Sequence, residues 1–307
     1  MPLTFKPQSL RIDFGIKEAL ELAMKKTVKL HPLYWSGCIL ILSQAITFLV
    51  ALQVKDFLEQ QQISPPAVSL GIPLIYFFGA VVLLGLVLFL IPMSKMRVVF
   101  KIMFALLFSW GMFVVLGFFL PVIVASLISV GVAILWSFRP RVWLHNSLLI
   151  LTLAGMGAVF GSILVPWTAL IFMVIISIYD ILAVRFGYMI WMAKKLSQLD
   201  TLPAFVIPKD MAGWNLDLKQ TRLTEDESSE RWFSILGGGD IGFPLLLVAS
   251  VFFAYGFASS LILAAFSLLG LAAVYCIQAV FLKGKPMAAL PPITFACLVG
   301  FLIVYFI

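Results

Sequence analysis

Residues 171–184 read IFMVIISIYDILAV, an apolar stretch in which Asp180 is the one charged side chain. The apolar run around this stretch extends over 166–192. A hydrocarbon core about 30 Å thick is crossed by about 20 helical residues, so the run is long enough to span a membrane. It therefore predicts a transmembrane helix that carries a carboxylate inside the bilayer.

The composition of the whole chain agrees with a membrane location. The 307 residues are 63% hydrophobic and only 11% charged, with a mean hydropathy of +1.11. Soluble proteins contain about 25% charged residues, and so few charges cannot cover the water-facing surface of a 34.0 kDa globule. The chain is predicted to be an integral membrane protein, and the composition excludes a disordered chain, a coiled coil and a disulfide scaffold.

Long apolar runs bounded by charge, Pro or Gly predict an all-α protein with nine transmembrane helices. The runs are too long and too continuous for the strands of a membrane barrel. Their approximate bounds are 33–54, 68–92, 99–119, 121–138, 147–164, 166–192, 237–256, 258–282 and 288–307. We expect a single polytopic domain, 1–307, with three parts: an N-terminal six-span part, a hydrophilic loop and a C-terminal three-span part (1–192, 193–236 and 237–307).

The basic residues are distributed unevenly across the predicted membrane. Nineteen of the 21 Lys and Arg residues lie in the N-terminal segment and in alternate loops on one side, while Lys55 lies on the other side and Arg185 within a span. The positive-inside bias predicts that the N-terminus and the 193–236 loop are cytoplasmic and that the C-terminus is extracytoplasmic. Residues 10–29 suit a helix on an anionic membrane surface and, equally, a solvated helix. The net charge of +7 requires no nucleic-acid partner.

The Cys and His residues provide no metal or cofactor site. Cys38, Cys276 and Cys297 lie singly in apolar runs, so no CxxC pair or disulfide framework is expected. His31 and His145 belong to no HExxH pattern, and a zinc site needs three or four convergent ligands. No GxSxG elbow occurs, which argues against a Ser/His hydrolase.

Two acidic side chains lie inside predicted spans. Twelve of the 14 Asp and Glu residues lie in the N-terminal segment or the aqueous loops; the exceptions are Asp180 and Asp240. A carboxylate at membrane depth costs upwards of about 2.5 kcal/mol unless it is protonated, paired or hydrated. An Asp180–Arg185 pair fits poorly, because five helical residues rotate a side chain by about 140°. A functional role for both acids is therefore favoured over a structural one.

Two neighbouring carboxyls could hydrolyse peptide bonds without a metal or cofactor. Carboxyls a few ångströms apart share one proton and titrate as a pair. One is then a base for water, and the other is an acid for the substrate carbonyl. Gly237, Gly238 and Gly239, directly before Asp240, permit close backbone approach and positive φ. A membrane-spanning substrate must first unwind, which an exposed strand edge near the site would promote by β-augmentation.

Three motifs resemble those of a known family. Tyr179-Asp180, Gly237-Gly238-Gly239-Asp240 and Ala288-Ala289-Leu290-Pro291 are similar to the YD, GxGD and PAL motifs of the presenilin and signal peptide peptidase family of intramembrane aspartyl proteases. The motifs occur in the family's order and on the corresponding spans. The resemblance implies that Asp180 and Asp240 are catalytic and that the other motif residues support the active site and position the substrate. One departure is Ala288, where the family motif has proline.

The resemblance also implies partners and orientation. The charge asymmetry matches the presenilin orientation, whereas the DIGFP stretch, 240–244, looks more like the peptidase branch. The short chain resembles a microbial presenilin homologue that cleaves single-span membrane proteins in a lipid bilayer. Obligatory partner subunits are not expected, and a homo-oligomer is compatible with the sequence. The 193–236 loop is expected to order with substrate or to be cleaved during maturation, as in presenilin.

Three alternatives stay open at this stage. A proton-coupled transporter or channel would also use two intramembrane carboxylates, as a proton relay, but would not explain the three motifs. A prepilin peptidase also has a GxGD aspartate, but its other expected motifs are absent from this sequence. A catalytically silent scaffold would have no need of two intact buried acids.

Overall fold

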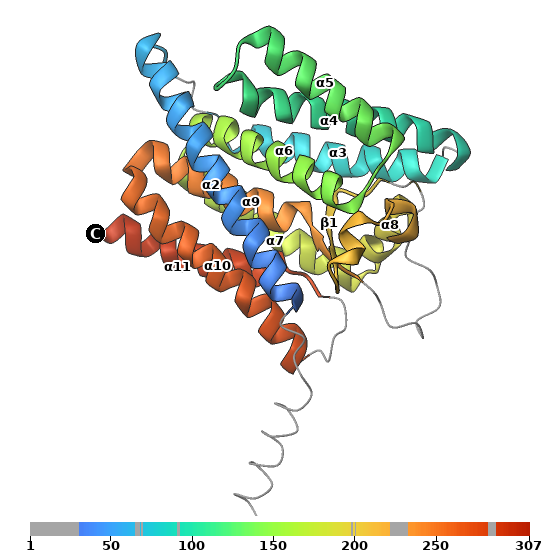
Figure 1. Cartoon of the computed structure of the whole chain (residues 1–307). Coiled ribbons are helices and arrows are strands. Elements are labelled where there is room, and N and C mark those ends of the chain that lie inside the picture. Colours follow the sequence, from blue (N-terminus) through green and yellow to red (C-terminus); the bar gives the residue numbers. More distant parts are fainter. Residues whose placement is uncertain are drawn as a thin grey trace, which may run out of the picture.

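The computed structural model describes residues 31–64, 68, 70–90, 93–197, 199, 201–221, 233–281 and 287–307. These residues form nine apolar helices (Figure 1): α2 (His31–Gln60), α3 (Gly71–Leu90), α4 (Met93–Gly117), α5 (Val122–Phe138), α6 (Val142–Ile163), α7 (Pro166–Arg185), α9 (Gly238–Tyr255), α10 (Phe257–Val280) and α11 (Leu290–Phe306). A short helix, two strands and two 3-10 turns complete the described part: α8 (Tyr188–Ser197), β1 (Ala204–Pro208), η1 (Ala212–Asn215), η2 (Leu218–Thr221) and β2 (Phe233–Gly237).

The nine apolar helices correspond one to one with the nine predicted spans. Six of those described are long and apolar enough to cross a membrane, and three are shorter apolar helices. Pro121 separates α4 from α5, as predicted, and its missing N–H is compatible with a helix start. The all-α membrane fold is therefore confirmed. The helix suggested for residues 10–29 lies outside the described residues.

The end of the sixth span differs from the prediction. The helix was expected to continue to residue 192, but α7 ends at Arg185 and α8 begins at Tyr188. Gly187 has a φ of +73°, a left-handed conformation that glycine adopts without steric cost. The Gly187 N–H donates to Val184 O at 3.1 Å, which satisfies a carbonyl at the helix end. Hydropathy alone misses this break, because apart from Arg185 the residues on both sides of it are mostly apolar.

Glycines let the central helices pack closely. In Figure 1, α6 and α9 lie in the middle of the bundle, and α6 contacts α2, α4 and α9. A Cβ at Gly161 of α6 would come within 2.5 Å of the Ala249 Cβ of α9, and one at Gly157 within 3.1 Å of Leu245. Small residues at helix contacts permit this approach inside a membrane. The start of α9 is therefore positioned against α6.

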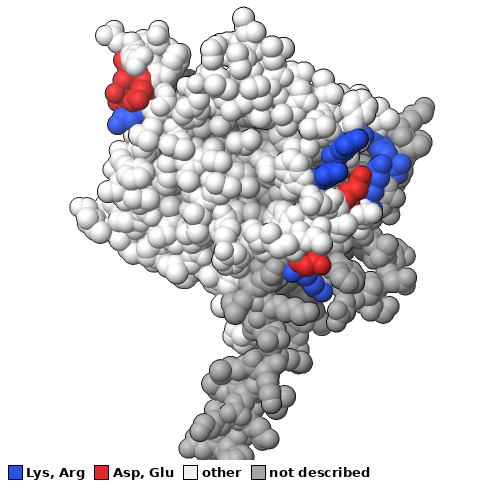
Figure 2. All heavy atoms as spheres, viewed as in Figure 1, with Lys and Arg blue, Asp and Glu red and all other residues white. Residues whose placement is uncertain are grey.

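One face of the described surface is charged at its ends and uncharged between them. On the face shown in Figure 2, Lys, Arg, Asp and Glu side chains gather at separated ends, with a broad uncharged band between them. Many large apolar side chains are exposed, including Ile75, Leu106 and Ile123. Such a surface would be poorly soluble in water but fits contact with lipid tails.

The described part of the hydrophilic loop contains a strand pair. Strands β1 and β2 pair antiparallel, with Ala204 opposite Gly237 and Pro208 opposite Phe233. All five residues of β1 are buried. This strand pair was not predicted as an element of the 193–236 loop. Residues 222–232, which include the consecutive acids Glu225, Asp226 and Glu227, lie outside the described residues.

Candidate active site

Asp180 and Asp240 lie on two helices that pack against each other. Asp180 is near the end of α7 and Asp240 is in the first turn of α9, so both carboxyls lie on the side of the bundle that carries the loop. Their side chains are buried, with exposed fractions of 7% and 9%. The two carboxyls are also close enough to interact electrostatically. Both acids are therefore buried on adjacent helices inside an apolar bundle.

The start of α11 completes the surroundings of Asp180. The Leu290 N–H donates to Asp180 Oδ2 at 3.3 Å, and Leu290 itself is 2% exposed. Ala289 is the N-cap of α11, and Pro291 and Pro292 follow Leu290 in its first turn. The positive end of a helix dipole favours a nearby carboxylate. The PAL-like segment, 288–291, therefore contacts Asp180 through its backbone.

The glycine run before Asp240 provides space. Asp240 accepts a hydrogen bond from the backbone of Gly237, the N-cap of α9, as the acid at position N3 of a capping box does. A Cβ at Gly237 would lie 2.9 Å from Asp240 Oδ2, and one at Gly238 would lie 2.9 Å from Pro203 O. The expected close approach is thus present. The expected positive φ is not, because Gly237 has a φ of −58° and Gly238 and Gly239 are helical.

Tyr179 faces an aromatic cluster beside the carboxyls. Its ring centroid lies 5.8 Å from that of Phe77 and 5.7 Å from that of Phe78, both on α3, in edge-to-face geometry. Phe77 also contacts Phe172 of α7 and Phe243 of α9. These rings connect α3 to the two helices that carry the aspartates.

The outer edge of β1 is closed by a side chain of α6. The Asn146 amide donates to Val206 O at 2.7 Å and accepts from Val206 N at 3.1 Å. The His145 ring nitrogen Nε2 lies 3.1 Å from Ala204 O. The Asn146 amide thus makes the two bonds that a neighbouring strand would make. From the sequence, His145 was considered as a metal ligand and as a hydrolase base and rejected as both, and Asn146 was not singled out.

The outer edge of β2 remains open among the described residues. In an antiparallel pair, opposite residues either exchange hydrogen bonds or both point their backbone groups outwards. Val206 points its groups at Asn146, so its partner Ile235 must point its own groups away from β1. The described sheet has two strands, so no third strand pairs with this edge. β2 leads directly into Gly237 and thus to Asp240.

Three hydroxyl groups connect β2 with α2 and α10. They belong to Tyr275, Ser36 and Ser234 and are here called the hydroxyl cluster. The Tyr275 hydroxyl of α10 hydrogen-bonds Ser36 of α2 and Ser234 of β2. Ser36 also donates to Pro32 O at 2.6 Å. Tyr275 is near enough to Asp240 for the two to interact electrostatically. Sequence analysis missed this cluster, since single Ser and Tyr residues in apolar helices have many structural roles.

No metal ligand set surrounds these groups. Among the residues with a described structure, no three His, Cys, Asp or Glu side chains converge. The described fold and site thus define a polytopic membrane protein with two buried carboxyls on adjacent helices.

Comparison with known proteins places the chain in a family. The family model described as "Signal-peptide peptidase, presenilin aspartyl protease" matches residues 37–307. A solved presenilin family intramembrane aspartate protease is similar in two crystal forms. The C222 form has a TM-score of 0.58 at 20% identity, covering 89% of this chain and 96% of the other. The P2 form has a TM-score of 0.53 at 22% identity, covering 88% and 95%. No curated protein matches significantly in sequence.

The chain belongs to the signal peptide peptidase and presenilin family of aspartyl proteases. It is therefore an aspartic-type endopeptidase of the membrane. The family resemblance expected from the three motifs is confirmed.

Proposed function

We propose that this protease hydrolyses peptide bonds within the transmembrane segments of single-span membrane proteins and that Asp180 and Asp240 are its catalytic pair. The observation that carries the proposal is the burial of both carboxyls where α7 packs on α9. A buried, charged carboxylate without function is costly in a membrane protein.

The pair holds one proton between its two carboxyls. The ionised carboxyl takes a proton from water as the water oxygen attacks the carbonyl carbon of the substrate. The protonated carboxyl donates its proton to the carbonyl oxygen, which gives a tetrahedral intermediate. The C–N bond then breaks: the protonated carboxyl gives its proton to the leaving nitrogen, and the ionised carboxyl takes a proton from a hydroxyl of the intermediate, so that the pair again holds one proton. No metal or cofactor takes part in these steps.

The open edge of β2 receives the unwound part of the substrate. An extended peptide adds to an exposed strand through main-chain hydrogen bonds, and the outward-pointing backbone of Ile235 provides a donor and an acceptor. Because β2 continues into the first turn of α9, a peptide bound there lies beside Asp240. Gly237, Gly238 and Gly239 keep this approach free of side chains.

The remaining motif residues position the pair. Leu290 fixes Asp180 through its N–H, while Ala288, Ala289 and Pro291 set the start of α11. Tyr179 connects α7 with α3. The site lies at the loop side of the bundle, and we assign this side to the cytoplasm, with the C-terminus extracytoplasmic. Water enters the site from the cytoplasmic side.

The proposal is tested with purified full-length protein in liposomes and a tagged single-span substrate. Asp180→Asn and Asp240→Asn should each lower the cleavage rate by about 10³-fold or more, since each removes a proton-transfer group. Asp56→Asn is the matched control, because Asp56 is an exposed acid of α2. Cleavage by either site variant at the wild-type rate would refute the two-aspartate mechanism. Aspartate-dependent proton flux without any cleavage would support the transporter alternative instead.

A further inference from the structure

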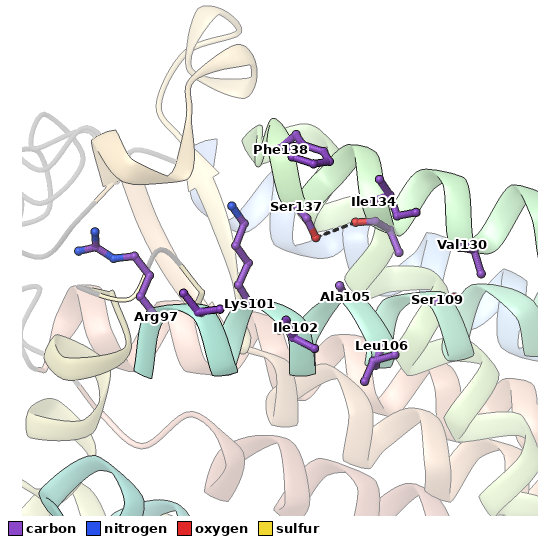
Figure 3. Close-up of a pocket in the computed structure, with 12 residues that line it drawn as sticks. Arg97, Lys101, Ile102, Ala105, Leu106, Ser109, Val130, Ile134, Ser137 and Phe138 are labelled. Carbon is purple, nitrogen blue, oxygen red and sulfur yellow. Dashed lines mark hydrogen bonds between the residues drawn. The ribbon is translucent and has the colours of Figure 1, made fainter. Parts of the chain in front are cut away.

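A hollow of about 470 Å³ lies between α4 and α5, away from the two aspartates (Figure 3). Its long walls are apolar, and the principal lining residues are Arg97, Lys101, Ile102, Leu106, Val130 and Ile134. Ile102, Leu106 and Ile134 are more than half exposed, so the hollow opens sideways, towards the membrane. We call it the α4–α5 groove.

The charged groups of the α4–α5 groove lie at one end. Arg97 and Lys101 are four residues apart on α4 and therefore share one helix face. Figure 3 shows both side chains at the same end of the groove. Further along, the Ser137 hydroxyl donates to Ala133 O at 3.0 Å, so it needs no ligand. The groove is thus apolar along its length and cationic at its mouth.

The cationic mouth lies on the loop side of the bundle. The chain between α5 and α6 is tied to the loop, since Leu218 N donates to Pro140 O at 2.9 Å and Arg141 forms a β-bridge with Asp217. Among the described residues, no carboxylate forms an ion pair with Lys101. A basic side chain at this membrane face, without an acidic partner, suits a negatively charged lipid headgroup.

The length of the groove matches one leaflet. From Arg97 to Ser109, a helix rises about 18 Å at 1.5 Å per residue. One leaflet provides about half of the 30 Å hydrocarbon core, or about 15 Å. Spread over about 18 Å, the volume of about 470 Å³ gives a mean cross-section of about 26 Å², whereas a partner helix about 10 Å across would need about 80 Å². A single acyl chain with a headgroup at one end fits these dimensions.

We propose that the α4–α5 groove binds an anionic phospholipid of the loop-side leaflet. The phosphate lies at Arg97 and Lys101, and one acyl chain lies along Ile102, Leu106 and Ile134. Free phosphate should bind more weakly, because it makes no contact with the apolar walls. A zwitterionic lipid should also bind more weakly, because its headgroup places a positive charge near Arg97 and Lys101. The proposal does not depend on the catalytic role of the two aspartates.

Native mass spectrometry of the detergent-solubilised full chain tests the proposal. The protein is titrated with dioleoyl phosphatidylglycerol and, separately, with dioleoyl phosphatidylcholine. Each basic side chain contributes about 1 kcal/mol to binding an anionic lipid, or roughly fivefold in affinity. The double variant Arg97→Gln/Lys101→Gln should therefore lose roughly 25-fold of the preference for phosphatidylglycerol. The matched control Lys195→Gln/Lys219→Gln removes two cations that do not line the groove and should keep the preference.

A second variant tests the apolar wall without a change of charge. Ala105→Phe places a ring in the groove and should weaken the first phosphatidylglycerol binding step at least about tenfold. The proposal is overturned if wild type binds the two lipids equally, if the control pair loses as much preference as the groove pair, or if Ala105→Phe binds phosphatidylglycerol as wild type does. Displacement of phosphatidylglycerol by millimolar inorganic phosphate would likewise overturn it.

Discussion

Replacing Asn146 by alanine removes the side chain that closes the outer edge of β1. Asn146 and Val206 are 2% and 1% exposed, and two hydrogen bonds join the Asn146 amide to the Val206 backbone. In the variant, the N–H and C=O of Val206 remain buried without a partner. The strand pair that leads to Asp240 should therefore open more often.

The magnitude follows from the two orphaned backbone groups. A buried polar group left without a partner costs about 1–3 kcal/mol, so two groups cost at least about 2 kcal/mol. This lower bound corresponds to a roughly 30-fold increase in the opening equilibrium. Because β2 leads directly into the first turn of α9, which carries Asp240, we also expect a lower kcat/KM for substrate cleavage.

Hydrogen exchange followed by mass spectrometry measures this opening directly. Peptides that cover β1 should exchange roughly 30-fold faster in Asn146→Ala than in wild type. Ser147→Ala is the matched control, since the neighbouring Ser147 on α6 is exposed, and its exchange should be unchanged. If protection of β1 in Asn146→Ala stays within about threefold of wild type, Asn146 does not hold the strand.

Three further substitutions test other contacts. Gly161→Ala places a Cβ 2.5 Å from the Ala249 side chain and should lower the free energy of unfolding by about 1–3 kcal/mol. The control Gly131→Ala meets no atom within 4 Å and should be neutral or stabilising in thermal denaturation. Equal melting temperatures of the two variants would contradict the close packing of α6 on α9. Gly237→Ala brings a Cβ to 2.9 Å from Asp240 Oδ2 and should lower kcat by about 10²-fold with normal folding, so a fully active variant would argue against the space requirement. Tyr275→Phe removes the central hydroxyl of the hydroxyl cluster and with it two hydrogen bonds. At about 1 kcal/mol for each lost bond, kcat/KM should fall about 5- to 25-fold, while the control Tyr305→Phe should keep wild-type activity. An unchanged kcat/KM in Tyr275→Phe would exclude a positioning role for Tyr275.

The helix pattern could be predicted because the bilayer sets the length and polarity of each span. The break at Gly187 could not be located by hydropathy, since the apolar run continues past it in spite of the single charge of Arg185. Strand β1 was missed for a related reason. Its five apolar residues lie in a loop with many charges, and they pair with a segment about 30 residues away.

The candidate site could be predicted only for residue types that are rare inside membrane spans. Asp180 and Asp240 stood out because a carboxylate inside a membrane span is costly. Their catalytic role and the membrane orientation stay predictions. Asn146 and Tyr275 could not be found in the same way, since each is an ordinary polar residue until the fold supplies its partner. Those partners lie 60 and 239 positions away along the chain.

The two prolines at the start of α11 affect how Asp180 is solvated. A helix start normally presents several unpaired amides, and an acid that accepts two or three of them is held firmly as an anion. Pro291 and Pro292 have no N–H to offer, while Leu290 supplies one bond to a single carboxyl oxygen. The second oxygen thus keeps lone pairs for an incoming proton or water molecule. Because the two prolines donate no hydrogen bonds, Asp180 is held in position by the Leu290 N–H while part of its hydrogen-bonding capacity stays available.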